Sequence, residues 1–248
     1  EGPSWVAPET LRPGGTPIGS IQKMHRASAS VEFGSVLESP GTHQGRTAGA
    51  FLERGFGVPC TRIDIPIGLK ATDAFFQHMK MMTGKPVPEK YVRQKQRLED
   101  SYVDGNRYVS QKKAIVFGEE NFVISLAGFL AEIGIIPVLC ASDGKSGVFR
   151  EVLMSYLPEN IRKKTGVHVN LNFEQIFEKA VQLKPDLMVG SSLGAHMARH
   201  LRIPLIRAGF PILDRLCGTR ILHVGYQGAQ QLFDNIVNSM IREEQEVA

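Results

Sequence analysis

Residues 112–142 read KKAIVFGEENFVISLAGFLAEIGIIPVLCAS, and the fold class can be inferred from this stretch. It begins with a short apolar run that ends in glycine, continues with a run of helical length that ends at Gly134, and closes with a second apolar run. Strands buried on both faces are continuously apolar, and parallel strands need a long connection between them, usually a helix. The stretch therefore predicts a strand-helix-strand unit of a parallel sheet.

The same alternation of apolar strands and amphipathic helices continues on both sides of this unit. Further strands are predicted at residues 29–35, 60–68, 167–172, 185–192 and 203–209. The segments between most of them have helical spacing, and residues 226–245 form a final amphipathic helix. We therefore expect an α/β protein with two Rossmann-like units, whose parallel sheets are covered by helices.

A long helix is predicted to join the two units. Residues 89–109, EKYVRQKQRLEDSYVDGNRYV, provide about five helical turns, and the KPVPEK segment before them interrupts the preceding helix. We accordingly place a partial α/β domain at residues 1–87. A C-terminal Rossmann-like α/β domain, with this helix at its start, is expected at residues 88–248.

The composition is that of an ordinary globular protein. Of 248 residues, 42% are hydrophobic and 22% are charged, with a formal net charge of +4 and a pI near 9.0. Basic and acidic residues alternate across residues 93–104, which is typical of a solvated helix face rather than a nucleic-acid surface. No apolar run approaches the roughly 20 residues that cross a bilayer. Neither nucleic acid nor a membrane is expected as a partner.

The N-terminal segment and the cysteines bear on the compartment. The segment has no charged stretch leading into an apolar one, so it is not a secretory signal, and it is interpreted as the start of a cut fragment. Cys60, Cys140 and Cys217 are odd in number and far apart. They argue against a disulfide scaffold and favour a reducing cytoplasm.

Small and polar residues follow several predicted strands, where open parallel sheets bind ligands. Residues 143–147, DGKSG, resemble a phosphate-binding loop, but a P-loop needs glycine at the position of Leu139. Residues 118–121, GEEN, place two carboxylates at a helix N-terminus, where they would repel a phosphate. Residues 190–192 and 207–211 are similar strand-end loops. Nucleotide binding is therefore disfavoured.

Few residues have the spacing of metal ligands. No two cysteines have a C-x-x-C spacing, and buried cysteines act as small apolar residues. His196 and His200 lie four apart on a helix, a geometry that can chelate a metal, but the glutamate of a zinc protease motif is absent. A surface pair is favoured.

Asp100 and Asp104 form a further pair on the long helix. Like charges four residues apart destabilise an isolated helix by a few tenths of a kcal/mol, so another group should offset their repulsion. Arg97 or Arg107 can do so, and so can a hard divalent cation, which prefers oxygen ligands.

Hydrolase chemistry has no support in the sequence, because no set of Ser, His and Asp residues includes a serine in a nucleophile-elbow context.

Six segments in register resemble the β-type subunits of the nitrogenase component 1 family. They are residues 13–24, 65–89, 97–109, 112–140, 185–215 and 223–241. Within the family, the resemblance is closest to the assembly scaffold of the iron-molybdenum cofactor, and the catalytic molybdenum-iron β-subunit comes next. The short stretch at residues 190–204 and the RAGFP sequence at residues 207–211 favour the scaffold.

The resemblance implies what this chain contains and what it lacks. Family subunits are about twice as long, with three α/β domains, and this chain is similar to the second and third. The cysteines of the bridging iron–sulfur cluster belong to the first domain, and a partner α-type subunit holds the large cofactor. No cofactor is therefore expected on this chain, which is not catalytic alone, although the full complex has iron–sulfur clusters and an iron-molybdenum cofactor. His223 does not match a ligand position.

The resemblance also implies partners and one site. The partners are an α-type subunit, a second β-type subunit and an iron-protein reductase, in a heterotetrameric complex active in nitrogen fixation or cofactor assembly. Asp100 and Asp104 match two acidic residues that help bind a cation between two β-subunits. Two alternatives remain, namely a free-standing α/β protein that binds a small molecule, and a nitrogenase-like reductase that acts on another substrate.

Overall fold

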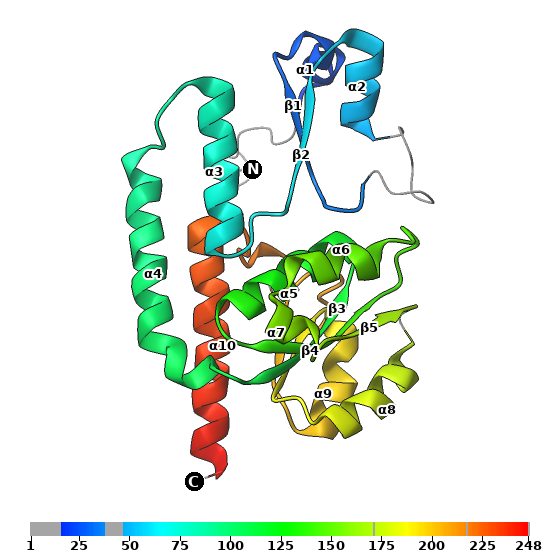
Figure 1. Cartoon of the computed structure of the whole chain (residues 1–248), viewed down its shortest axis with the longest axis vertical. Coiled ribbons are helices and arrows are strands. Elements are labelled where there is room, and N and C mark those ends of the chain that lie inside the picture. Colours follow the sequence, from blue (N-terminus) through cyan, green and yellow to red (C-terminus); the bar gives the residue numbers. More distant parts are fainter. Residues whose placement is uncertain (1–15, 38–46, 171, 217, 248) are drawn as a thin grey trace, which may run out of the picture. The chain divides into compact units, whose positions relative to one another are not determined.

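The computed structural model describes residues 16–37, 47–170, 172–216 and 218–247. These residues form two compact units. The first contains residues 16–32 and 47–62, and the second contains residues 33–37 and the described residues from 63 onward. Each unit is described by itself (Figure 1).

The first unit is a small α/β unit. Its helices are α1 (Ile18–Gln22), the 3-10 turn η2 (Met24–Arg26) and α2 (Ala48–Phe56), and β1 (Ser30–Phe33) pairs with β2 (Cys60–Ile63). Helix α2 begins where the Thr47 side chain accepts a hydrogen bond from the Ala50 amide, and it ends at Gly57 with φ 69°. The predicted order of strand, helix and strand is therefore confirmed here.

The second unit is built around a five-stranded parallel sheet. In spatial order the strands are β5 (Gly166–Val169), β4 (Ile136–Ser142), β3 (Lys113–Gly118), β6 (Leu187–Gly190) and β7 (Leu205–Arg207). Every neighbouring pair runs parallel. The connections are α5 (Glu120–Glu132), α6 (Phe149–Tyr156), α7 (Glu159–Arg162), α8 (Phe173–Leu183), η3 (Ser192–Gly194) and α9 (Ala195–Leu201). The predicted parallel α/β sheet is confirmed.

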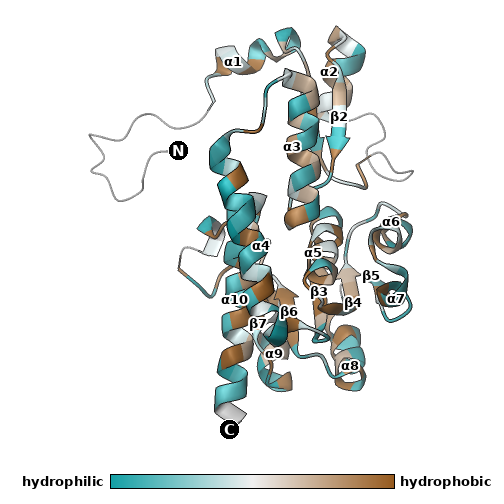
Figure 2. Cartoon of the chain, turned by 60° about the vertical axis from the view of Figure 1, so that its left-hand side comes forward, coloured by the Kyte–Doolittle hydropathy of each residue, from teal (hydrophilic) through white to brown (hydrophobic). Residues whose placement is uncertain are grey.

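Helices cover both faces of this sheet because successive residues of a strand point to opposite faces. On β3, Ala114 and Val116 belong to one apolar core with side chains of α5, α6 and α10 (Gly225–Val247). Ile115 and Phe117 belong to a second core, with side chains of α8 and α9. In Figure 2, β3 and β6 have hydrophobic colours, and the helices around them are of mixed colour. Both faces of the sheet are therefore buried.

Two long helices, α4 (Glu89–Val109) and α10, lie side by side next to this sheet. Helix α3 (Leu69–Thr83) precedes α4, and α4 packs against α10. Gly105 of α4 is buried, and a β-carbon added to it would lie 2.6 Å from Cζ of Phe233, which is 2% exposed. Only a glycine allows the two helices this close approach.

The compact units differ from the predicted domain ranges. Both α3 and α4 belong to the second unit, whereas the predicted boundary falls between them, after residue 87. That boundary was inferred from the break at KPVPEK and the long helix after it, and it stays a prediction.

Replacing Gly105 by alanine should destabilise the protein. The new methyl group would overlap the buried Phe233 ring, so we expect the free energy of unfolding to fall by about 1–3 kcal/mol. Gly128 of α5 is the matched control, because a β-carbon there meets nothing within 4 Å. Gly128→Ala should gain up to about 1 kcal/mol from helix propensity. Urea denaturation measures the free energy of unfolding of both variants. A Gly105→Ala variant as stable as the wild type would contradict the packing argument.

Candidate functional site

The strand-end loops singled out in the sequence meet at one edge of the five-stranded sheet. β3 ends at Gly118, β4 at Ser142, β6 at Gly190 and β7 at Arg207, and these strands all run parallel. Their carboxyl ends therefore share one edge, which is where open α/β sheets bind ligands.

The Gly-Lys-Ser loop at this edge is closed by the protein itself. Glu120, only 4% exposed, accepts a hydrogen bond at Oε1 from the Ser146 amide at 3.4 Å. A β-carbon on Gly144 would lie 2.3 Å from Cδ of the same side chain. The Glu120 carboxyl group thus lies where a phosphate would have to approach the loop backbone, which agrees with the prediction against nucleotide binding.

Glu119 is also engaged within the protein. Its Oε2 accepts a hydrogen bond from the Phe122 amide at 3.0 Å, and its Oε1 accepts one from the Asn121 side chain at 2.8 Å. The Asn121 side-chain oxygen in turn accepts a hydrogen bond from the Val36 amide at 2.9 Å. The two carboxylates of the GEEN segment therefore cap α5 and tie down the neighbouring loops.

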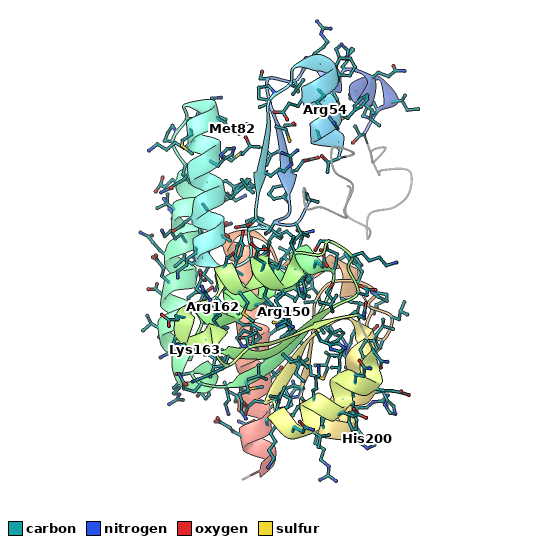
Figure 3. All side chains as sticks on the ribbon, turned by 45° about the vertical axis from the view of Figure 1, so that its right-hand side comes forward. Arg54, Met82, Arg150, Arg162, Lys163 and His200 are labelled. Atoms are coloured by element: carbon teal, nitrogen blue, oxygen red, sulfur yellow. The ribbon has the colours of Figure 1, made fainter. Side chains whose placement is uncertain are left out.

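The two histidines of α9 lie at the surface, as the sequence predicted. The ring centroids of His196 and His200 are 6.0 Å apart, and His200 also meets the Phe177 ring edge-on at 5.4 Å. Figure 3 shows His200 on the outer side of α9. Within the described ranges, no group of three or more His, Cys, Asp or Glu residues is placed to hold a metal ion. The pair alone does not make a complete site.

The two cysteines that the structure describes do not fit an iron–sulfur cluster. Cys140 is fully buried inside β4, and burial raises the pKa of its thiol. Cys60 hydrogen-bonds Glu32 at 3.6 Å, and burial together with the Glu32 charge raises its pKa. Clusters bind thiolates, which both environments disfavour. Cys217 lies outside the described residues.

Asp100 and Asp104 are both exposed on α4. The sequence suggested that Arg97 or Arg107 offsets their repulsion. The Arg107 guanidinium instead hydrogen-bonds the hydroxyl of its neighbour Tyr108. Among residues 16–37, 47–170, 172–216 and 218–247, no salt bridge to either aspartate is found. The two carboxylates remain a candidate for a cation, and none of the residues that the structure describes joins them as a third ligand.

One half-buried polar network was missed by the sequence analysis. Tyr226 of α10 donates its hydroxyl hydrogen to Asp73 of α3 at 2.6 Å, and Lys95 of α4 donates to the same carboxylate at 2.6 Å. The hydrogen bond to Asp73 raises the pKa of Lys95. Asp73 and Tyr226 are 153 residues apart, so no local pattern shows this contact, which ties three helices together.

Comparison with known proteins identifies the family of this chain. Residues 6–241 match the model of the family described as "Nitrogenase component 1 type Oxidoreductase". The chain belongs to the nitrogenase component 1 family. The family resemblance inferred from the six sequence segments is thereby confirmed.

The named relatives indicate that the chain is of the β type. It is 31% identical over 234 residues to the nitrogenase molybdenum-iron protein beta chain of Methanococcus maripaludis, covering 92% of this chain and 48% of that one. It is 33% identical over 209 residues to the nitrogenase vanadium-iron protein beta chain of Trichormus variabilis, covering 80% and 44%. The chain thus spans about half the length of these relatives.

A solved structure shows the same fold. The chain titled "Nitrogenase Cp1 at pH 6.5" superposes with a TM-score of 0.90 at 27% identity, covering all of this chain and 52% of that one. Family membership and fold therefore agree. Across the described part of the chain, no helix combines the length and apolar character needed to span a membrane.

The Gly-Lys-Ser loop should not respond to phosphate. Because the Glu120 carboxyl group fills the approach to the loop, we expect ATP or inorganic phosphate to leave the melting temperature unchanged. Lys145→Ala serves as the control variant and should behave like the wild type with either compound. Differential scanning fluorimetry measures the shift. A rise of several degrees that Lys145→Ala abolishes would show that the loop binds phosphate after all.

Proposed function

We propose that this chain is the framework part of a β-type subunit in a nitrogenase component 1-like complex that takes part in nitrogen fixation. The supporting observation is the match to component 1 beta chains over nearly the whole chain. The chain would complete the fold of the subunit and carry contacts to partner subunits, while redox clusters would depend on residues elsewhere in the complex.

Two alternative roles are compatible with this proposal. The first is assembly of the iron-molybdenum cofactor. The short stretch at residues 190–204 and the RAGFP sequence support a scaffold. The second role is catalysis, and it is favoured by the names of the relatives, which are beta chains of molybdenum-iron and vanadium-iron nitrogenases. In both roles the subunit would pair with an α-type subunit that holds the large cofactor, and an iron-protein reductase would serve the complete complex.

We further propose that α4 contributes to contact with a second β-type subunit through a shared cation. Asp100 and Asp104 are exposed, and the side chains at such positions lie about 5–6 Å apart at their β-carbons, close enough to share one ion. Val103, between them, is 78% exposed, which is a large exposure for an apolar side chain. Two carboxylates satisfy only part of the ligand shell of a hard divalent cation, so the rest would come from water and the partner.

Reconstitution should distinguish the two roles. The longer protein that contains this chain, co-expressed with a component 1 α-type subunit, is expected to purify as a complex of both subunits. A scaffold would not form ammonia from dinitrogen with the iron protein, but it would activate a cofactor-free molybdenum-iron protein. A catalytic subunit would form ammonia directly. Failure to associate with any α-type subunit would contradict the proposal, and reduction of a different substrate would assign the complex to another reductase.

Removing the acidic pair should weaken cation binding to the assembled complex. In Asp100→Asn/Asp104→Asn, both carboxylates become neutral amides, so we expect the affinity for Ca²⁺ and Mn²⁺ to fall at least about tenfold. Glu89→Gln is the matched control, because Glu89 lies on the same helix and pairs with Arg93 at 2.5 Å. Equilibrium dialysis measures Ca²⁺, and electron paramagnetic resonance measures Mn²⁺. Equal binding by the double variant and the wild type would show that the two aspartates do not bind the cation.

A further inference from the structure

A cavity of about 730 Å³ lies in the second unit, at the β7 edge of the sheet. Its walls come from α9, from β7 and the loop after it, and from the C-terminal half of α10. Four of the lining side chains are arginines, namely Arg199, Arg207, Arg215 and Arg242. The volume is within the range of small-molecule sites in proteins. We refer to this space as the arginine cavity.

Arg207 shows how a carboxylate is held in this cavity. Its Nε donates a hydrogen bond to Oδ1 of Asp214 at 2.8 Å, and its Nη2 donates one to Oδ2 at 2.6 Å. The planar guanidinium group thus meets both carboxylate oxygens, which is the geometry that makes arginine a specific partner of carboxylates. The hydrogen bond from Arg207 lowers the pKa of the Asp214 carboxyl group. These two side chains therefore neutralise each other.

The other three arginines have no carboxylate partner among the residues that the structure describes. Arg199 donates from Nε to the backbone oxygen of Ala195 in its own helix at 3.3 Å. Arg215 donates from Nη1 to the backbone oxygen of Asp214 at 2.8 Å. Arg242 makes no hydrogen bond within the described ranges. The other N–H groups of these arginines are left for water or a ligand.

The charges that line the arginine cavity do not balance. Besides Asp214, the wall contains one carboxylate, that of Glu243. Arg199, Arg215 and Arg242 therefore leave an excess of two positive charges. Like charges around one cavity repel each other, and a bound anion offsets that repulsion. A ligand with two negative charges matches the excess.

The rest of the wall narrows the class of anion. Its apolar residues include Ala198, Ile203, Pro204 and Leu205, which suit a short carbon chain. No aromatic side chain lines the described wall, so a nucleotide base would have no ring to stack on. The three arginines come from three separate segments of the chain. Charges that are spaced along a carbon chain match this arrangement better than one compact ion such as inorganic phosphate does.

We propose that the arginine cavity binds a small organic dicarboxylate. Its two carboxylates accept hydrogen bonds from Arg199, Arg215 and Arg242, in the way that Asp214 accepts them from Arg207, and its carbon chain lies against the apolar wall. The site does not depend on the role proposed above for the complex.

Two probes of the same shape test this site. Glutarate carries two carboxylates, and glutaramide carries two neutral amides at the same positions. At low ionic strength, the longer protein that contains this chain is expected to bind glutarate at least about tenfold more tightly, because charged hydrogen bonds are stronger than neutral ones. Isothermal titration calorimetry measures both dissociation constants. Equal binding of the two probes, or no binding of glutarate, would overturn the proposal.

Charge-matched variants locate the site. Arg199→Gln/Arg242→Gln removes two of the three arginines, so glutarate should bind at least about tenfold more weakly. Both side chains are exposed, so the variant should fold. Arg93→Gln/Arg202→Gln is the matched control, because it removes the same charge from two exposed arginines that do not line the cavity. It should bind as the wild type does. Equal affinities of the two double variants would overturn the proposal.

A third variant should strengthen binding, which a folding defect would not do. The Glu243 carboxylate on the wall repels a dicarboxylate, so Glu243→Gln should bind glutarate about threefold or more tightly than the wild type. Glu244→Gln is the matched control, because Glu244 is exposed and does not line the cavity. It should leave the affinity unchanged. Glutarate binding by Glu243→Gln that is no tighter than binding by Glu244→Gln would contradict the proposal.

An acidic peptide separates a small ligand from a protein partner. The same calorimetry is done with a peptide of six glutamates. Binding of this peptide without binding of glutarate would assign the arginines to contact with an acidic protein surface, and it would overturn the proposal.

Discussion

The second unit depends on the complete burial of strand β3. It pairs with β4 on one edge and with β6 on the other, and its residues from Ala114 to Phe117 are at most 1% exposed. Its backbone groups are satisfied by both neighbours, and its side chains alternate between two separate cores. A strand buried in this way requires helices on both faces, and the connections that supply them bring the strand-end loops to one edge.

That edge contains two outcomes of the same topology. Beside β4, the carboxyl group of Glu120 lies against the Gly-Lys-Ser loop and completes it from within the protein. Beside β6 and β7, the strand ends line an open cavity of the second unit. A loop sequence that resembles a ligand site is thus closed, whereas a segment without any motif lines an open space. The difference lies in which side chain the neighbouring helix presents.

Helix α4 illustrates how one element serves both the fold and an interaction. Its inner face holds Leu98, Gly105 and Val109, which are buried against the rest of the second unit. Its outer face carries the exposed acidic pair. Because the helix is held by packing at Gly105 and by the Lys95 bond to Asp73, its outer face is presented on a rigid element. That rigidity suits a site whose remaining ligands would come from another subunit.

The sequence by itself determined the parallel α/β architecture, the extent of α4 and the family, because hydrophobic periodicity and local segments contain that information. Only the tertiary structure decided how Asp73, Lys95 and Tyr226 join α3, α4 and α10. It alone shows why residue 105 is glycine, and that Glu120 closes a loop that resembles a phosphate-binding loop. It also decided that the His223 ring lines a cavity formed by three strand ends. These contacts join residues far apart in the chain, and no local pattern specifies which distant side chains will meet, because packing of the whole unit sets their separation.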